Sequence, residues 1–254
     1  MLEKIFFVMP DLSRTRQETL KKFAKGGTKI DILVSYSIII EKPSIMERIK
    51  NLRKFCGEVM LDSGAYHILT GFRDKRWFES IILKYANFVN QNRQYFDYVV
   101  APDIPGDSKA TIKNTIIFSS KVENFVPVLQ GNSKEEYLGC FRQLENLGFI
   151  SGDQPLGIGN MASFRDSSTD KLERVLSTLD KKGIKKIHLF GANLKIIKKL
   201  GNYLWSCDIS SWQREIAFRR RTVHRARTLV DANYKAILTY LRKIRLSLER
   251  KNLI

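Results

Sequence analysis

The sequence predicts a single closed (β/α)8 barrel, a TIM-type α/β fold, and three observations support this fold class. The chain has 254 residues, close to the ~250 that such a barrel needs as a single domain. Eight short apolar runs recur along it, separated by stretches with helical character. The runs are continuous rather than alternating, as in parallel strands covered on both faces. A doubly wound open sheet is the alternative, and both folds place their chemistry at the carboxyl ends of the strands.

The first four expected strands are rich in β-branched and aromatic residues. They cover residues 5–9 (IFFVM), 30–36 (IDILVSY), 58–62 (EVMLD) and 98–103 (YVVAPD). Helices are expected at residues 13–26 and 43–55, where Ser13 is a suitable N-cap and Gly26 a suitable stop. The longest connection, residues 63–77, follows the third strand, and barrels often carry lids in such loops.

The second half continues the alternation of strand and helix. Strands are expected at residues 125–130 (FVPVLQ), 155–159 (PLGIG), 186–191 (KIHLFG) and 203–208 (YLWSCD). Helices are expected at residues 107–124, 133–148 and 168–183, with Asp107, Ser133 and Ser168 as N-caps. A second long connection, residues 160–169, follows the sixth strand. We find no segment that repeats its own sequence at a solenoid-like period, so a repeat array is not expected.

We expect a barrel catalytic domain over residues 1–211 and a basic helical segment over residues 212–254 that packs on it. The segment has 12 Lys or Arg and 3 Asp or Glu, so it carries +9 of the net charge of +18. Ile237, Leu241, Ile244 and Leu248 recur at helical spacing and predict an amphipathic helix. The segment is either the closing helix of the barrel with a solvated basic face, or a clamp for nucleic acid; the run of arginines at 219–221 favours the clamp.

The overall composition favours a polyanionic partner and a reducing compartment. The chain has 44 basic and 26 acidic residues and a pI near 9.9, a balance that attracts nucleic acids over long distances. Cys56, Cys140 and Cys207 form no CxxC pair, so neither a disulfide framework nor a cysteine zinc site is expected, and a cytoplasmic location fits. Nowhere do about 18 apolar residues run uninterrupted, so no membrane span is expected.

Three carboxylates stand at the ends of apolar strands: Asp62 in MLDSGAYH, Asp103 in VAPDIPGD and Asp208 in WSCDISSW. Each could cap the helix that follows, which Asp does well. Burial of an ionised carboxylate without a partner destabilises the fold by roughly several kcal/mol. Three of them at one end of a barrel therefore predict an active site.

The neighbours of these acids suggest recognition of a flat base. Tyr66 offers an aromatic plane next to Asp62. Gln130 ends the fifth strand with an amide that both donates and accepts, and Gly131 leaves its backbone open. A carboxylate can accept from the N1 and N2 hydrogens of guanine while amide groups donate to O6. Core packing for Tyr66 and a turn for Gln130 are the simpler alternatives.

These motifs resemble the tRNA-guanine transglycosylase family and, within it, the DNA 7-deazaguanine transglycosylases of phages and bacteria. The resemblance spans residues 58–220. LDSGAYH is similar to the family's Asp-Ser-Gly-Gly-aromatic-Gln segment, VLQG to its Val-Gln-Gly and PLGIGN to its Gly-Leu-Ala-Val-Gly-Glu. HLFGAN and CDISSW resemble its Leu-Met-Gly-Val-Gly and nucleophile segments. The order of the motifs and their placement on the expected strands agree as well.

The resemblance implies a role for each matching residue. Asp208 would be the nucleophile, Asp62 the general base, Asp103 and Gln130 the readers of the guanine edge, and Tyr66 the stacking ring. Ser63, Gly131, Leu156 and Gly157 lie in the matching base-binding segments and are assigned to the substrate site as well. Asp208 would attack C1′ of a guanosine nucleotide to form a glycosyl-enzyme. A free base such as 7-cyano-7-deazaguanine would then replace guanine, with no cofactor, after the target nucleotide has flipped out.

Three features look more like the branch that modifies DNA: the missing zinc module, the APDIPGD segment and the SCDISSWQREIAFRR stretch. No Cys follows Cys207, so the three-cysteine zinc site of the tRNA enzymes is absent. A separate departure concerns the base: Pro155 has no N–H to donate to O6 where the family has a glycine. Arg214, Arg219, Arg220 and Arg221 follow the nucleophile segment and would contact the phosphates beside the flipped nucleotide.

Three other functions remain open at this point: a zinc-free tRNA transglycosylase, a catalytically inactive barrel that binds nucleic acid through residues 212–254, and an unrelated small-molecule enzyme. The sequence does not distinguish a monomer from a homodimer, nor show whether an accessory protein delivers the DNA. We expect a cytoplasmic protein, in the host cytoplasm if it is viral.

Overall fold

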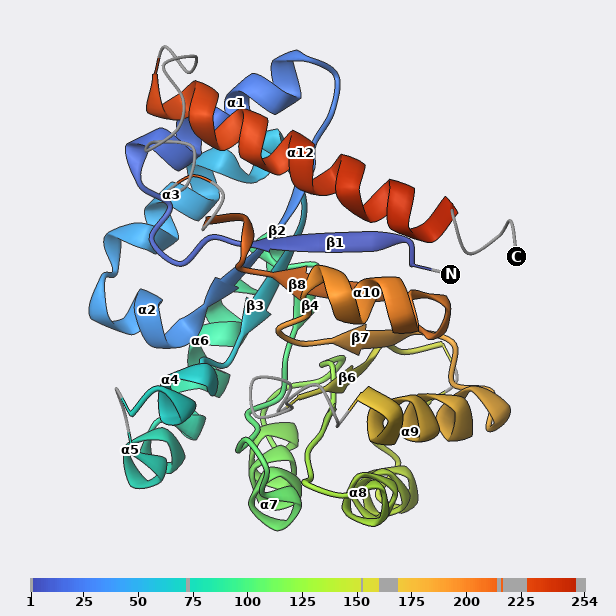
Figure 1. Cartoon of the computed structure of the whole chain (residues 1–254). Helices are drawn as coiled ribbons and strands as arrows, with labels where there is room; N and C mark the ends of the chain where they lie inside the picture. The colour runs from blue at the N-terminus through green and yellow to red at the C-terminus, as the bar shows by residue number, and fades with distance from the viewer. Residues whose placement is uncertain are drawn as a thin grey trace.

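The computed structural model describes residues 2–71, 74–151, 153–159, 169–213, 216 and 228–249. It contains one eight-stranded parallel sheet that curls inside a ring of helices (Figure 1). The strands are β1 (Lys4–Val8), β2 (Ile30–Ser35), β3 (Cys56–Asp62), β4 (Tyr98–Val99), β5 (Val128–Leu129), β6 (Leu156–Ile158), β7 (Ile187–Leu189) and β8 (Ser206–Ile209). Their order in the sheet is β4-β3-β2-β1-β8-β7-β6-β5. All eight expected strands are confirmed.

The two end strands of this order meet, which closes the sheet. Val100, directly after β4, forms a parallel bridge with Val126, just before β5. The Ala101 amide donates to the Val126 carbonyl at 2.9 Å, and the Val126 amide donates to the Val99 carbonyl at 2.7 Å. The fold is therefore a TIM-type α/β barrel, as the sequence predicts, and not an open doubly wound sheet.

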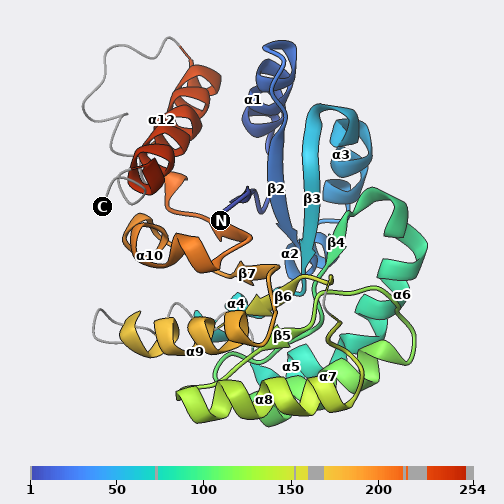
Figure 2. The same ribbon diagram turned by 90° about the vertical axis from the view of Figure 1, so that its right-hand side faces the viewer.

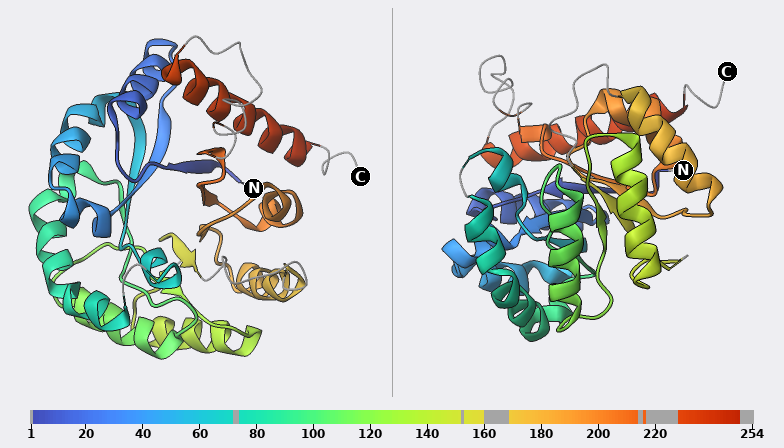
Figure 3. Two further views of the ribbon diagram at one scale, coloured as in Figure 1. Left: turned by 60° about the vertical axis from the view of Figure 1, so that its left-hand side comes forward. Right: turned by 90° about the horizontal axis from the view of Figure 1, so that it is seen from below.

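The five expected helices are present within a few residues of their predicted ends. They are α1 (Arg14–Lys25), α3 (Ser44–Leu52), α7 (Ser108–Ser119), α8 (Lys134–Asn146) and α9 (Thr169–Lys181). Together with α6 (Ile82–Asn92), α10 (Leu194–Leu200) and α12 (Leu229–Glu249), they surround the strands (Figures 2 and 3). Of the shorter helices, α2 (Tyr36–Glu41) directly follows β2.

The connection after β3 is more ordered than a loop. It contains α4 (Tyr66–Leu69) and the start of α5 (Lys75–Ser80). The Asp74 carboxylate accepts a 2.6 Å hydrogen bond from the Trp77 amide and so begins α5 as its N-cap. Lys75 then donates to Asp107, the N-cap of α7, at 2.7 Å. The connection is thereby attached to the rim of the barrel. Residues 160–168 of the second long connection lie outside the described residues.

Helix α12 closes the outer ring. It packs against α1 and α10, and Figure 3 (left) shows it in red beside blue α1 and orange α10. Ile237 and Ile244 of the predicted apolar stripe are buried, while Leu241 and Leu248 pack against the core. The Tyr234 ring lies 4.3 Å from the Phe23 ring between centroids. α12 therefore occupies the place of the barrel helix that follows β8.

The barrel interior has its own small apolar cluster. Because side chains alternate along a strand, every second residue points inward, and Phe6, Leu33, Met60, Val100, Val126 and Val128 fill the centre. The amino-terminal end is closed by Lys4, which forms an ion pair with Glu58 and lies 5.4 Å from the Trp205 ring centroid. The inner core supports the opposite, carboxyl-terminal end, where the acids lie.

The cysteines lie in the core of the barrel, and the helices are those of its outer ring. All three cysteines are buried free thiols, and burial raises the pKa of Cys56 to about 12 and that of Cys140 to about 11. Of the helices in the described ranges, none is both long and apolar enough to cross a membrane.

Candidate active site

The predicted acids are brought together at the carboxyl-terminal end of the barrel. Asp62 is the last residue of β3, and Asp208 lies in β8. Gln130 directly follows β5, and Asp103 lies four residues after the end of β4. In β8 the alternation is clear: Cys207 points into the outer apolar layer, so Asp208 points inward. The negative charges of Asp103 and Asp208 both raise the pKa of Asp62, so the three carboxyls interact electrostatically.

Asp103 and Gln130 form a buried hydrogen-bonded pair. The Gln130 Nε2 donates to Asp103 Oδ2, and the Ser63 hydroxyl donates to Asp103 Oδ1 at 3.3 Å. The Gly106 amide donates to Gln130 Oε1 at 3.1 Å and so fixes which way the amide points. A Cβ atom on Gly159, the residue after β6, would lie 2.0 Å from Gln130 Nε2, so this position needs glycine for the pair to form.

The environment of Asp62 favours its protonated form. Burial, followed by the charges of Asp103 and Asp208, raises the pKa of Asp62 to about 8, although the Gly64 amide donates to its Oδ2 at 3.0 Å. Burial also raises the pKa of Asp103, but only to about 6, because the Gln130 and Ser63 hydrogen bonds oppose it. At neutral pH the site therefore holds a protonated carboxyl, which can donate a proton, and a carboxylate, which can accept hydrogen bonds.

Asp208 is held by one of its two oxygens. The Gly191 amide donates to Asp208 Oδ1 at 2.8 Å, from a turn in which Gly191 has a φ of +70° that favours glycine. The Nε2 atom of His188 lies 3.5 Å from the same oxygen. Within the part of the chain that the structure describes, Oδ2 accepts no hydrogen bond. Oδ2 is thus the oxygen available to react.

His188 is the residue that the sequence analysis missed. It lies in β7, is fully buried, and shares a 2.7 Å hydrogen bond between its Nδ1 and the Ser206 hydroxyl of β8. The Phe190 ring packs on it at 4.4 Å between centroids. The available signal was alternation: in KIHLFG and WSCD, His188 and Ser206 fall on the inward-facing positions of two adjacent strands, where a polar residue is unusual.

The remaining predicted site residues lie around this centre. Tyr66 begins α4 and is 59% exposed, so its ring is open to a ligand. Gly131 packs against α8, where a Cβ would lie 2.9 Å from the Tyr137 nitrogen. The amides of Leu156 and Gly157 already donate to the Lys186 and Pro127 carbonyls, both at 2.8 Å. These two residues can therefore contact a base only through other atoms.

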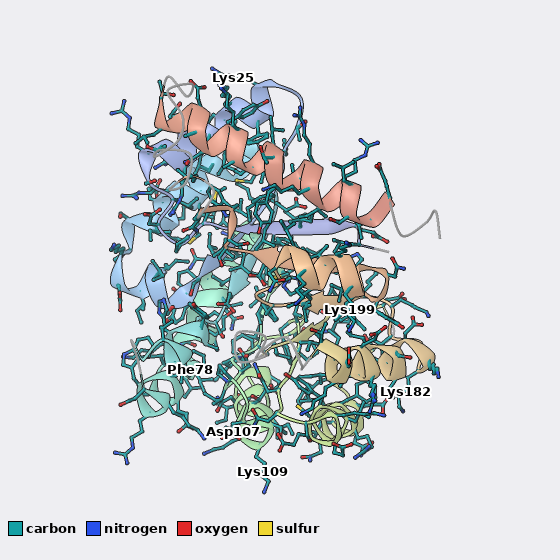
Figure 4. All side chains as sticks on the ribbon, in the orientation of Figure 1. Lys25, Phe78, Asp107, Lys109, Lys182 and Lys199 are labelled. Atoms are coloured by element: carbon teal, nitrogen blue, oxygen red, sulfur yellow. The ribbon has the colours of Figure 1, made fainter. Side chains whose placement is uncertain are left out.

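The four arginines predicted to bind nucleic acid, Arg214, Arg219, Arg220 and Arg221, lie outside the described residues. Many other basic side chains are distributed over the outer helices, and Figure 4 shows Lys109 and Lys182 at the periphery. Among the described residues, no group of three or more His, Cys, Asp or Glu is arranged to hold a metal ion.

No family model and no curated protein matches this chain. Similar solved structures include a putative fructose-1,6-bisphosphate aldolase from Coccidioides immitis, with a TM-score of 0.61 and 11% identity over 96% of this chain and 90% of that one. A fructose-bisphosphate aldolase from Campylobacter jejuni has a TM-score of 0.58 and 12% identity over 98% and 90% of the two chains. At this identity the likeness establishes the barrel fold and leaves the reaction to the chemistry of the site.

Proposed function

We propose that this chain is a base-exchange transglycosylase that replaces guanine in DNA with a 7-deazaguanine base. One observation carries the proposal. A carboxyl with one oxygen that accepts no hydrogen bond from the described residues (Asp208), a carboxyl with a raised pKa (Asp62) and an oriented carboxylate–amide pair (Asp103 with Gln130) share one barrel mouth. These are the nucleophile, the proton carrier and the base reader that such an exchange needs.

In the first half of the reaction Asp208 displaces guanine. Its Oδ2 forms a bond to C1′ while the C1′–N9 bond breaks and its electron pair leaves with guanine. The proton on Asp62 passes to the departing base, so guanine leaves neutral and Asp62 becomes a carboxylate. The product is a glycosyl ester on Asp208, as in retaining carboxylate glycosidases.

The second half restores the nucleic acid. The Asp62 carboxylate removes the N9 proton of the incoming 7-deazaguanine, N9 bonds to C1′, and the ester bond to Asp208 breaks. Asp62 is then protonated again and Asp208 is free. The raised pKa of Asp62, about 8, suits a group that both gives and takes a proton near neutral pH.

Asp103 and Gln130 account for the choice of base. A carboxylate accepts from the N1 and N2 hydrogens of guanine, which adenine does not offer in the same pattern. A ring held in this way can stack on the exposed Tyr66. DNA is preferred over tRNA on the sequence departures described above, and the net charge of +18 supports a nucleic-acid substrate of either kind.

The test is to incubate the protein with labelled guanine and either duplex DNA or tRNA, with Asp208→Asn as the control. Label should enter DNA, and a covalent protein–DNA adduct should form with the unaltered chain only. Exchange into tRNA alone would replace the DNA substrate by the tRNA alternative. DNA binding with no exchange and no adduct would leave an inactive nucleic-acid-binding barrel.

A further inference from the structure

The geometry points to a buried Ser206–His188 pair that orients the nucleophile Asp208, an inference that rests on the proposed function. We infer that His188 is a positioning residue: its Nε2–H is directed at Asp208 Oδ1, and Ser206 determines which imidazole nitrogen carries that proton. The pair would thereby hold Asp208 so that Oδ2 faces C1′ of the nucleotide.

The Ser206 hydroxyl selects the tautomer of His188. Its Nδ1 is 2.7 Å from the Ser206 hydroxyl, which can either donate or accept. Its Nε2 is 3.5 Å from Asp208 Oδ1 and, among the described residues, has no hydrogen-bond partner. If Nε2 carried a lone pair, two acceptors would face each other in a buried site. The favourable arrangement has Ser206 donating to Nδ1 and the proton on Nε2.

Packing holds the His188 ring in one orientation. The imidazole is fully buried, with the Phe190 ring at 4.4 Å on one side and the Phe6 ring at 5.8 Å on another. Such packing leaves the ring few rotamers. A Cβ on Gly157 of β6 would lie 2.6 Å from Phe190, so glycine at this position leaves room for the Phe190 ring.

Both neighbours of the Asp208 carboxyl lie at the same oxygen. The Gly191 amide donates to Oδ1, and the His188 Nε2 lies 3.5 Å from it. The Gly191 hydrogen bond and the electrostatic contact with the His188 Nε2 edge act on the same oxygen, which restricts rotation of the carboxyl group about its Cβ–Cγ bond and leaves Oδ2 as the attacking atom. Orientation of a nucleophile can contribute greatly to rate, and a misplacement of about 1 Å can cost on the order of 10²-fold.

The experiment compares two matched substitutions of His188. His188→Gln keeps an N–H near the Nε2 position, whereas His188→Asn keeps one near Nδ1, beside Ser206. The measured quantity is the single-turnover rate of adduct formation on DNA at saturating concentration, with thermal melting as a check of folding. We expect His188→Asn to lower this rate about 10²-fold and His188→Gln to stay within about tenfold of the unaltered chain, with KM unchanged in both. Equal rates for the two variants, whether lowered or not, would overturn the assignment.

A second measurement does not depend on catalysis. In the ¹⁵N NMR spectrum of labelled histidine, the His188 Nε2 should carry the proton and Nδ1 should be the acceptor. In Ser206→Ala the preference should weaken, and in Asp208→Ala the Nε2–H signal should shift because its acceptor is gone. An Nδ1–H tautomer in the unaltered chain would refute the orientation. If the unaltered chain forms no adduct with DNA or tRNA, the proposed function fails, while these spectra still decide the contact between His188 and Asp208.

Discussion

Protonation of single carboxyl groups is central to the chemistry proposed for this barrel. Asp62 and Asp103 lie at the same end of the barrel, yet the pKa of Asp62 is raised to about 8 and that of Asp103 only to about 6. Burial acts on both, but Asp103 receives hydrogen bonds from Gln130 and Ser63. Environment, rather than residue type, thus gives two aspartates different roles.

The rate of base exchange should therefore have a bell-shaped dependence on pH, with limbs near 6 and 8. Below the lower limb Asp103 becomes protonated and no longer accepts from guanine, and above the upper limb Asp62 loses the proton that guanine needs to leave. In Asp103→Asn the loss of a neighbouring negative charge should lower the pKa of Asp62, which moves the alkaline limb to lower pH. Steady-state rates from pH 5 to 9 measure this, and an alkaline limb unmoved in the variant would contradict the coupling.

Asp62 should also reduce the stability of the fold as pH rises above about 4. In the unfolded chain its pKa has the ordinary value of 3.8, whereas in the folded chain its pKa is about 8. The folded state therefore binds more protons between these values, and the free energy of unfolding falls as pH rises through them. We expect Asp62→Asn to be more stable than the unaltered chain by about 1–2 kcal/mol at pH 8. Urea unfolding should show this difference shrinking toward pH 4.

At the scale of a single strand, glycines determine how much room a neighbouring side chain has. Gly157 lies in β6 and Gly159 directly follows it, and each leaves room for a neighbour: Phe190 for Gly157 and Gln130 for Gly159. Because β5, β6 and β7 are adjacent, a methyl group at position 157 would disturb the Phe190 ring beside His188, and one at position 159 would disturb the Asp103–Gln130 pair.

Gly159→Ala should displace Gln130 and reduce exchange by about 10²-fold, since the added Cβ would meet Gln130 Nε2 at 2.0 Å. Gly139→Ala is the matched control: Gly139 lies in α8 and a Cβ there meets nothing within 4 Å. The control should keep full activity and gain about 0.5–1 kcal/mol of stability. The idea fails if both variants exchange guanine equally well.

Helix α12 should be part of the folding unit. Ile237→Ala removes a fully buried side chain and should cost about 2–4 kcal/mol of unfolding free energy. Leu246→Ala, on the same helix but 55% exposed, should change it by less than about 0.5 kcal/mol. Chemical denaturation of both variants checks this; a small effect of Ile237→Ala would mean that α12 docks only loosely on the barrel.

At the scale of the whole molecule, charge should govern affinity for nucleic acid. The net charge of +18 is spread over the chain, but half of it belongs to residues 212–254. Long-range attraction brings a polyanion to the protein, while contacts near the mouth would hold one nucleotide over the acids.

DNA binding should therefore weaken steeply with salt, and the slope should depend on which cations are removed. A triple substitution of Arg219, Arg220 and Arg221 by Ala should reduce the slope of log K against log salt by about 2–3. The control removes three charges at the opposite end of the barrel: Lys181, the last residue of α9, and Lys182 and Lys185 in the connection before β7. If both triple variants change the slope equally, binding is diffuse and not centred on the mouth.

The sequence by itself determined the architecture. Continuous apolar runs, N-cap residues and glycine stops depend on local propensity and periodicity, so eight strands and five helices could be located from them. α6 and α10 were not predicted, because α6 follows a connection expected to be a loop and α10 is a single short helix of seven residues. The acids at the strand ends were predicted because parallel strands direct their carboxyl ends to one side.

Only the tertiary structure decided what those acids experience. That Gln130 donates to Asp103, that Gly191 holds Asp208 and that His188 lies beneath it are contacts between residues distant in sequence or on different strands. The pKa of Asp62 depends on burial and on two carboxyls 41 and 146 positions away in the sequence. Desolvation and Coulomb energy depend on distance in space, which a linear pattern of residues does not contain.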